Sequence, residues 1–514
     1  MSRQLLPIDL VSPGSAGLNL QQKGSILNPI WATLATNCVV DDAGRLAARN
    51  GYSVTTTTDI TSLPDVKTIF EYIQGDGVVE PIVAWDGGIA NDLADPEGND
   101  ISGAVTDTDG RWNFHNFNEK VIGFQDGQKP VVRPSASNFA TVVESGGTAP
   151  TIFNGVGFAG YGRVWGLDSD GQTIRISGLL DETDWDTTAD SKTIDMSNVW
   201  TGGMDVVSAI TAFNGRLIVF GKNHIVIWED GTGSQLGIDP DNLVVIDVIQ
   251  GTGCESQHTI QHIGEADIVF LSRNGLQSLG RVIQEKSNPL TNVSKYVRDD
   301  FLGDFRLNGT DTVQSSYYGE DGLYVLSLPD VSKTWIFHVK NAFRDEEGDT
   351  VFPATTWTLA PTALEVRRDG TLLFGGPGQV WTYGNDSDAG SLIDFKYASP
   401  WLDLGENIAN RLKMLKRLGS ILFVRNNTNI SFSWAVDFKE GRKFANAEVV
   451  DPVVSEWNVG EWGLAEWSGG LFLNIIKVPA RATGQYYKVY LESNVQGQFA
   501  LQQLELFAKV GRIA

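Results

Sequence analysis

The sequence contains few of the residues from which disulfide and metal sites are built. Only 2 of its 514 residues are cysteine and only 5 are histidine. A disulfide framework is excluded, because it needs several cysteine pairs. We find no nucleophile-elbow, HExxH, phosphate-loop or Rossmann glycine motif, which removes the commonest hydrolase, metalloprotease and nucleotide-binding classes. We expect a protein that is not an enzyme and that holds no cofactor.

Basic residues and long apolar runs are also scarce. The chain has 39 lysines and arginines against 63 acidic residues, a formal net charge of -24. Phosphate binding needs clustered basic side chains, so tight nucleic-acid binding is not expected, although DNA could slide past such a surface. No apolar run approaches the roughly 20 residues that span a bilayer, and the N-terminus lacks the apolar core of a secretion signal. We therefore expect a soluble protein made in a cytoplasm.

Glycine and tryptophan, in contrast, are abundant, with 56 and 15 copies. Short β-branched and aromatic runs separated by glycine turns are typical of an all-β protein. One such theme recurs about every 40–55 residues, which is the spacing of four-stranded propeller blades. We predict a six- or seven-bladed β-propeller, although stacked β-sandwiches would give a similar local pattern. The copies are 81–90, 120–132, 162–177, 215–228, 266–280, 321–339 and 370–384.

The pattern changes after residue 385. Alternating strands are expected at 392–405, 417–426, 429–438, 485–494 and 501–510. They predict a C-terminal β-sandwich over residues 386–514, after a propeller over 66–385 and an N-terminal arm with a hairpin over 1–65. Within the arm, 35–52 reads as a hairpin, with Gly44 able to adopt the positive φ of a tight turn. The best helix candidate is Thr291–Gly303, with Asn292 or Ser294 as its cap and Gly303 as its stop.

Two stretches have the residue types of a metal site. Cys254, His258 and His262 lie four residues apart, but on a strand they would spread over about 26 Å, too far for one ion. Asp168, Asp170 and Gly171 suggest a calcium loop, yet Leu179 stands where the twelfth-position glutamate should be. An ordinary Asp-Gly hairpin turn is the favoured interpretation there. No metal is expected at either place.

Acidic and aromatic clusters leave a glycan-related function open. The acids of 181–190 could present paired carboxylates for sugar hydrolysis, but exposed loop acids are commoner. Glu-Trp pairs recur around Trp457, Trp462 and Trp467, where tryptophan faces could stack on sugars or anchor a subunit interface. The interface is favoured, because no sugar cleft is implied elsewhere.

One short segment is basic in this acidic chain. The run 409–418 contains Arg411, Lys413, Lys416 and Arg417. A nucleic-acid site would need more such residues with aromatic side chains between them. We expect a contact patch for an acidic neighbouring subunit instead.

The order of several motifs resembles that of the tail nozzle proteins of short-tailed bacteriophages, the tail tubular protein B-like group. The motifs are a Gly-Leu-Asn start at 17–19, an Asn-valine strand at 37–40, a Gly-Arg-Leu turn at 44–46 and an Arg-x-Gly close at 49–51. The segment 266–280 resembles the group's central blade, and 433–438 with 499–514 resembles its C-terminal end. Each motif is weak alone, and their order along one chain carries the resemblance.

This resemblance implies a structural virion protein. It would form a homo-oligomer, a hexameric ring or funnel below the portal and the adaptor protein, made in the host bacterial cytoplasm and located in the tail. The ring would close the tail, contact a tail fibre or tailspike, and let double-stranded DNA pass during ejection without binding it tightly. On this view 35–52 is a platform hairpin, and Arg45 and Arg49 join the basic run and the three tryptophans as candidate assembly residues. The alternative for the hairpin is that it closes the first blade.

Two functions of other classes remain as alternatives. One is a glycan-binding or glycan-hydrolysing propeller, resting on 181–190 and the Glu-Trp pairs. The other is a cellular propeller scaffold for protein partners. A ring of about six chains in solution would separate the nozzle from both.

Overall fold

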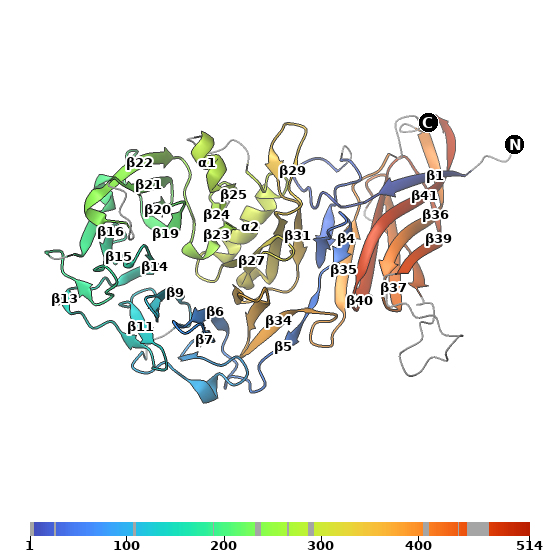
Figure 1. The fold of residues 1–514 in the computed structure, drawn as a ribbon. Helices are drawn as coiled ribbons and strands as arrows, with labels where there is room; N and C mark the ends of the chain where they lie inside the picture. Colours follow the sequence, from blue (N-terminus) through green and yellow to red (C-terminus); the bar gives the residue numbers. More distant parts are fainter. Residues whose placement is uncertain are drawn as a thin grey trace.

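The computed structural model of the chain describes residues 5–24, 27–105, 109–188, 190–231, 238–264, 267–285, 292–403, 411–439, 441–449 and 472–513. Figure 1 shows two units side by side, the propeller and, at its right, the C-terminal unit, where both chain ends lie. Among the described residues, no helix has the length and apolar character needed to cross a membrane.

Seven successive sheets form the propeller, which confirms the predicted all-β class. Each predicted copy of the repeat is a hairpin within one sheet. Blade 1 contains Val66–Ile73 (β6), Val79–Trp85 (β7) and Gly88–Ala90 (β8), and blade 2 contains Asn113–Phe117 (β9), Lys120–Phe124 (β10), Val131–Pro134 (β11) and Ala140–Thr141 (β12). Blade 3 contains Ile152–Gly160 (β14), Arg163–Asp168 (β15), Thr173–Ile176 (β16) and Lys192–Asp195 (β18). Blade 4 contains Val207–Phe213 (β19), Arg216–Gly221 (β20), His224–Asp230 (β21) and Leu243–Gln250 (β22).

The remaining three blades follow in chain order. They are blade 5, Gln261–Ile263 (β23), Asp267–Ser272 (β24) and Gly275–Ser278 (β25); blade 6, Gln314–Tyr318 (β26), Leu323–Leu328 (β27), Lys333–His338 (β28) and Ala354–Trp357 (β31); and blade 7, Ala363–Val366 (β32), Leu372–Gly376 (β33) and Gln379–Asn385 (β34). Short pairs lie outside the blades: Gly146–Gly147 (β13) with Asp184–Trp185 (β17), and Phe343–Arg344 (β29) with Thr350–Val351 (β30). The 3-10 turns are Glu97–Asn99 (η1), Met196–Asn198 (η2), Pro240–Asn242 (η3), Gln257–Thr259 (η4) and Pro329–Val331 (η5).

The first strand of each blade lies at the centre of the ring. In order around the axis, β6 contacts β9, β9 contacts β14, β14 contacts β19, β19 contacts η4 just before β23, β23 contacts β26, β26 contacts β32, and β32 returns to β6. The ring is therefore closed. The side chains between these strands leave a cavity of about 390 Å³ on the axis.

The helix prediction was wrong in its bounds. The described helices are Leu279–Glu285 (α1) and Arg298–Asn308 (α2). Helix α2 begins after Val297 without a side-chain cap, continues through Gly303 and ends at Gly309, which has φ +79°. Ser294 does not cap it, because its hydroxyl accepts a hydrogen bond from the Leu276 backbone N–H. The apolar side chains of the helix face the core and draw the helix past Gly303.

Two sheets form the C-terminal unit. One contains Arg411–Val424 (β36), Phe472–Gly484 (β39) and Phe499–Ile513 (β41), and the other contains Ile393–Ala398 (β35), Thr428–Val436 (β37), Lys443–Val449 (β38) and Tyr487–Val495 (β40). Their facing side chains, such as Leu418 and Phe432, are fully buried in a common core. That core continues into blades 5 and 6 through residues such as Leu271 and Trp335.

The N-terminal segment joins the two units. Its strands are Leu6–Val11 (β1), Leu34–Thr36 (β2), Cys38–Val40 (β3), Leu46–Ala48 (β4) and Gly51–Val54 (β5). β2 lies between β31 of blade 6 and β35, so blade 6 and a C-terminal sheet become one sheet of nine strands. The hairpin of β3 and β4 pairs with β41, and β5 completes blade 7 beside β34. The segment is thus part of three sheets.

The predicted hairpin is present, and its surroundings differ from the interpretation that it closes the first blade. Gly44 has φ +71° in the turn between β3 and β4, as a tight turn requires. The hairpin does not close the first blade, because it adds to the C-terminal sheet while the next strand closes the last blade. The backbone edge of the hairpin that faces β41 already forms hydrogen bonds to that strand of the same chain.

A buried ion pair fixes the point where this segment leaves the hairpin. The Arg49 guanidinium donates to both Asp388 carboxylate oxygens, at 2.8 and 2.6 Å. Its Nε donates to Asn37 Oδ1 at 3.2 Å, and the same Asn37 oxygen accepts from the Thr358 backbone N–H. The Arg49 side chain is only 1% exposed. One guanidinium thus connects the hairpin to the end of blade 7 and, through Asn37, to Thr358, the residue that follows β31 of blade 6.

We predict that Arg49→Ala lowers the free energy of unfolding by about 3 kcal/mol, because Asp388 would lose its partner in a largely buried site. Urea unfolding followed by tryptophan fluorescence measures the change. The matched control is Lys340→Ala, which removes the exposed Lys340–Asp42 pair and should cost less than about 1 kcal/mol. Equal losses in the two variants would contradict a locking role for Arg49.

Candidate assembly face

The sheet of β36, β39 and β41 buries one face and exposes the other. Side chains alternate along β36, so that Leu418 and Leu422 enter the core while Ile421 and Phe423 point outward. No other described sheet covers the outward side. We call this surface the outer face.

Apolar side chains occupy the middle of the outer face. Ile421 pairs directly with Ile475 of β39, and Phe423 pairs with Leu473. Ile475 is 62% exposed and Leu473 is 55% exposed. Phe507 of β41 continues the strip beside Arg417. Cross-strand partners stabilise one another, but these side chains still leave apolar area in contact with water.

Basic side chains surround this apolar strip. The Arg45 guanidinium lies 4.3 Å from the centre of the Phe423 ring, and Lys477 Nζ lies 4.9 Å from that of Phe507. Lys477 also pairs with Glu505 at 3.5 Å. Arg417 and Arg481 are exposed on the same face. In a chain of net charge -24, this combination is suited to an acidic protein surface with apolar side chains of its own.

A β-bulge accounts for two adjacent basic residues. Against β41, the register of β36 shifts between Leu415 and Arg417, so Lys416 is the extra residue there. The register against β39 shifts at the same place, but there the additional residue lies in β39. Lys416 is half-buried and Arg417 is exposed. Arg411 is exposed at the start of β36. The structure thus brings Arg45, Lys416 and Arg417 together on or beside one sheet face, with Arg411 at its end.

Two of the predicted assembly residues lie inside the chain instead. Arg49 forms the buried pair with Asp388 described above. Lys413 is fully buried, and its Nζ donates to the Gln485 backbone oxygen at 2.9 Å. Burial lowers the pKa of the Lys413 amine. Neither side chain reaches a surface where a second subunit could contact it, so both are removed from the candidate interface.

The three tryptophans of the Glu-Trp pairs, Trp457, Trp462 and Trp467, lie outside the described residues. The sequence also did not predict strand β39, which supplies Leu473, Ile475 and Lys477. Pro479 was the available signal for the position of this strand, because proline within a sheet is confined to edge strands. In the structure β39 pairs on one side with β36.

The cysteine and histidine triplet does not form a metal site in the part of the chain that the structure describes. Cys254 Sγ is directed to the Ser256 backbone oxygen at 3.2 Å, and His262 Nε2 lies 3.1 Å from Thr211 Oγ1. The described acids that do approach one another closely are Asp345, Glu347 and Asp349. Lys295 Nζ already pairs with all three, so this cluster has its cation.

The acidic candidates of the propeller are used in local structure. Asp168 pairs with Arg175 across the β15–β16 hairpin, whose turn contains Gly171 at φ +67°. Within 181–190, Glu182 pairs with Lys120 and Asp190 with Arg163. The Asp-Gly turn is confirmed, and these carboxylates serve as ion-pair partners between strands and loops.

Comparison with known proteins gives no family. No family model and no curated protein matches this chain. Among solved structures, the WD40 β-propeller domain of Doa1 matches with 11% identity, 65% of this chain, 96% of that chain and a TM-score of 0.36. The extracellular domain of a putative one-component system from B. thetaiotaomicron matches with 12% identity, 90% of this chain, 61% of that chain and a TM-score of 0.41. PorZ of Porphyromonas gingivalis matches with 11% identity, 66% of this chain, 42% of that chain and a TM-score of 0.33.

All three TM-scores lie below 0.5, so these matches carry no argument about function. The propeller assignment rests on the order of strands within each blade and on the closed ring of inner strands.

We predict that Leu473→Thr with Ile475→Thr reduces binding of a hydrophobic fluorescent dye to the folded protein. Threonine keeps the β-propensity of the strand, so the free energy of unfolding should change by less than about 0.5 kcal/mol per site. Val143→Thr is the control, because Val143 is 79% exposed but lies outside the outer face. Unchanged dye fluorescence in the double variant would show that the outer face is not an accessible apolar surface.

Proposed function

We propose that this chain is a structural protein of a bacteriophage tail, the subunit of a nozzle ring that closes the tail and lets DNA pass. The proposal rests first on the ordered motifs between residues 17 and 51 and in the middle and C-terminal parts of the chain. Further support comes from the way the N-terminal segment joins the propeller and the C-terminal unit. A ring subunit under load needs two such units to move together.

The joining segment is the structural observation that supports the proposal. β2 makes blade 6 continuous with β35, and one apolar core extends across both units. An interface between independently moving domains would be smaller and more polar. The chain is therefore a two-part rigid frame, which suits a scaffold whose faces must keep fixed positions.

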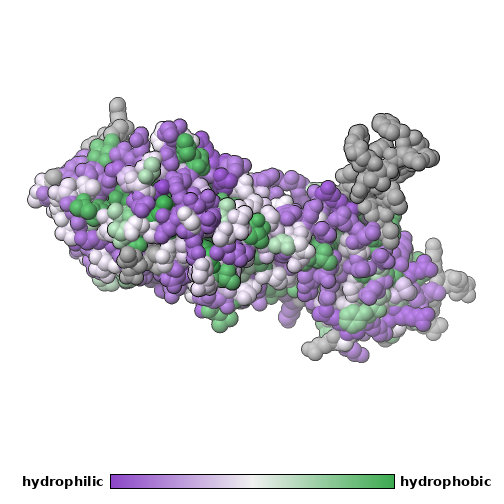
Figure 2. All heavy atoms as spheres, turned by 90° about the horizontal axis from the view of Figure 1, so that it is seen from below, coloured by the Kyte–Doolittle hydropathy of each residue, from purple (hydrophilic) through white to green (hydrophobic). Residues whose placement is uncertain are grey.

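The outer face is the candidate contact with a neighbouring subunit or the adaptor protein. Its apolar strip supplies burial, and the exposed Arg417 supplies positive charge toward an acidic chain. Arg45 and Lys477 border the strip as well and are also paired within the chain, with Asp41 and Glu505. Figure 2 shows that hydrophilic side chains dominate the surface seen from below, with hydrophobic ones in small separate patches. Contacts between subunits would then depend on a limited apolar area together with charge.

The propeller's own axis does not offer a path for DNA. The axial cavity has a volume of about 390 Å³, and Arg111 of blade 2 crosses the axis to donate to the Val313 backbone oxygen before blade 6, at 2.8 Å. A bore for DNA would have to lie between subunits. An acidic wall there would repel the DNA backbone and keep it from sticking.

The assembly test compares three proteins by size-exclusion chromatography with light scattering and by electron microscopy. We expect a ring of about six chains for the wild type. Arg417→Glu with Lys477→Glu should dissociate it, because both changes place negative charge on the outer face. The control, Lys192→Glu with Arg216→Glu, makes the same change in net charge at two partly exposed propeller sites that pair with Asp241 and Glu229, and should keep the ring.

Each result has a separate meaning. A wild type that stays monomeric at all concentrations would contradict the nozzle ring itself. A ring that persists in the outer-face variant would leave the ring but remove this face from its interface.

We also predict weak or absent binding of the ring to duplex DNA at physiological salt. Six chains at -24 each repel a polyanion over the Debye length of roughly 8 Å. An electrophoretic mobility shift assay measures this binding. Tight binding that Lys416→Ala with Arg417→Ala abolishes would contradict the prediction and would place these side chains on a DNA path.

A further inference from the structure

The axial cavity of the propeller collects titratable side chains that the proposed assembly role does not use. Three of the chain's 5 histidines line it, His115, His258 and His262, together with Glu365 of β32 and Lys67 of β6. They come from blades 1, 2, 5 and 7 and meet only because the ring closes. A cavity with convergent polar groups of shifted pKa is the usual form of a binding site.

The three histidines and Glu365 are uncharged at neutral pH. Burial lowers the pKa of His115 to about 4 and also lowers those of His258 and His262. Burial, with Glu71 nearby, raises the pKa of Glu365 to about 8. A strongly charged ligand would find no counter-ion among these four groups.

One buried hydrogen-bonding atom among the lining residues lacks a protein partner. His115 donates to the Gly157 backbone oxygen, which leaves its Nε2 as an acceptor that no donor meets among the described residues. Glu365 accepts from the Glu71 backbone N–H, and its raised pKa favours the protonated carboxyl at neutral pH. A protonated carboxyl is a donor and a neutral imidazole nitrogen is an acceptor, so the cavity offers both kinds of partner.

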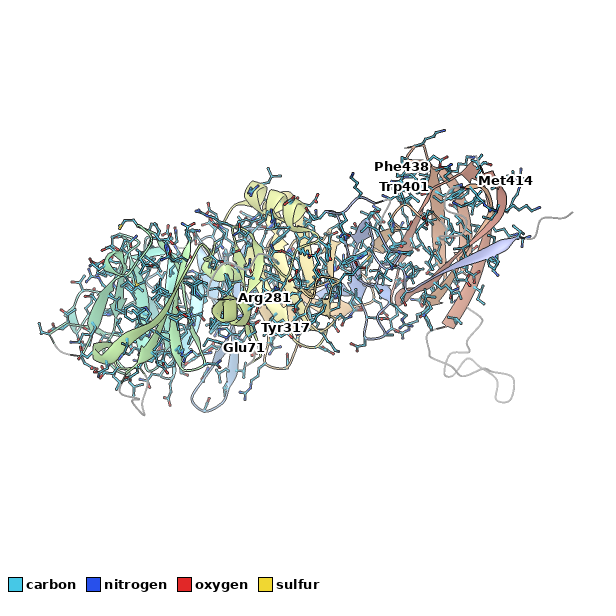
Figure 3. The ribbon with its side chains drawn as sticks, turned by 90° about the horizontal axis from the view of Figure 1, so that it is seen from above. Glu71, Arg281, Tyr317, Trp401, Met414 and Phe438 are labelled. Carbon is cyan, nitrogen blue, oxygen red and sulfur yellow. The ribbon has the colours of Figure 1, made fainter. Side chains whose placement is uncertain are left out.

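Apolar side chains complete the lining. Phe70 and Phe158 are half-buried and border the same space. His262 is exposed and marks the side that is open to solvent. Glu71, labelled in Figure 3, is held by Arg367 and by the Arg368 backbone N–H, so it is not free to pair with a ligand.

We propose that the axial cavity binds a neutral, polyhydroxylated ligand of monosaccharide size. Hydroxyl groups both donate and accept, which matches the mixed polar atoms, and the carbon face of a sugar ring fits against Phe70 or Phe158. The volume of about 390 Å³ lies at the small end of ligand sites. This inference goes beyond the assembly role and does not depend on the outer face.

The test is saturation-transfer NMR and calorimetry on the full chain with glucose, galactose and N-acetylglucosamine as probes. Acetate and methylamine are the charged comparison probes. We expect at least one sugar to bind, with an affinity that falls by up to about tenfold per pH unit above pH 8, as the Glu365 carboxyl loses the proton that it donates. The facing histidines stay neutral through this window because their pKa values are lowered.

Two variants separate a direct role from a structural one. Glu365→Gln keeps a neutral donor, so binding should remain and lose its dependence on pH between 6 and 9. Glu448→Gln, an exposed site on β38, is the matched control and should keep the wild-type pH profile. Binding of no sugar at pH 6.5, preference for acetate or methylamine, or a pH profile unchanged by Glu365→Gln would each overturn the proposal.

Discussion

The structure depends on where one short strand pairs. β2 contains three residues, yet it separates β31 of the propeller from β35 of the C-terminal unit and hydrogen bonds to both. The next two strands add to a different C-terminal sheet, and the following one completes blade 7. Residues 34–54 therefore hold together three sheets that come from distant parts of the sequence. Because Arg49 is buried at the turn between these sheets, the position of the segment is set by an ion pair as well as by strand pairing.

Charged side chains have two different roles in this arrangement. Buried pairs such as Arg49–Asp388 and Arg133–Glu80 are internal links, and most propeller acids bind a neighbouring backbone or cation. The outer face differs, because its basic side chains border exposed apolar ones. A single short run of basic sequence, 411–417, thus divides into an internal lysine, a bulge residue and exposed arginines. Its function can be judged only once the strand register is known.

Much of the fold could be predicted from the sequence, because hairpins are local. Each repeat copy combines two apolar runs with a glycine turn, and each forms the middle of a blade. The pairings of β2 and β5 could not be predicted, since they join residues more than three hundred positions apart. Helix α2 was displaced from its predicted bounds because tertiary packing of Phe301 and Phe305 outweighs the local effect of Gly303.

The candidate sites also could be predicted from the sequence only in part. Arg45 was predicted from the hairpin of the resemblance and Arg417 from the basic run. Lys413 belongs to the same run but faces inward, because inward and outward positions alternate along β36. His115, His258 and Glu365 are far apart in the sequence, and ring closure alone brings them to one cavity.

The central claim is that residues 34–54 make the propeller and the C-terminal unit one cooperative frame. Native-state hydrogen exchange with mass spectrometry measures it directly. The account predicts that the amides of β2 and β5 exchange only through global unfolding, as slowly as those of β27 and β40. Early exchange of these two strands, with the two units unfolding in separate steps, would contradict it.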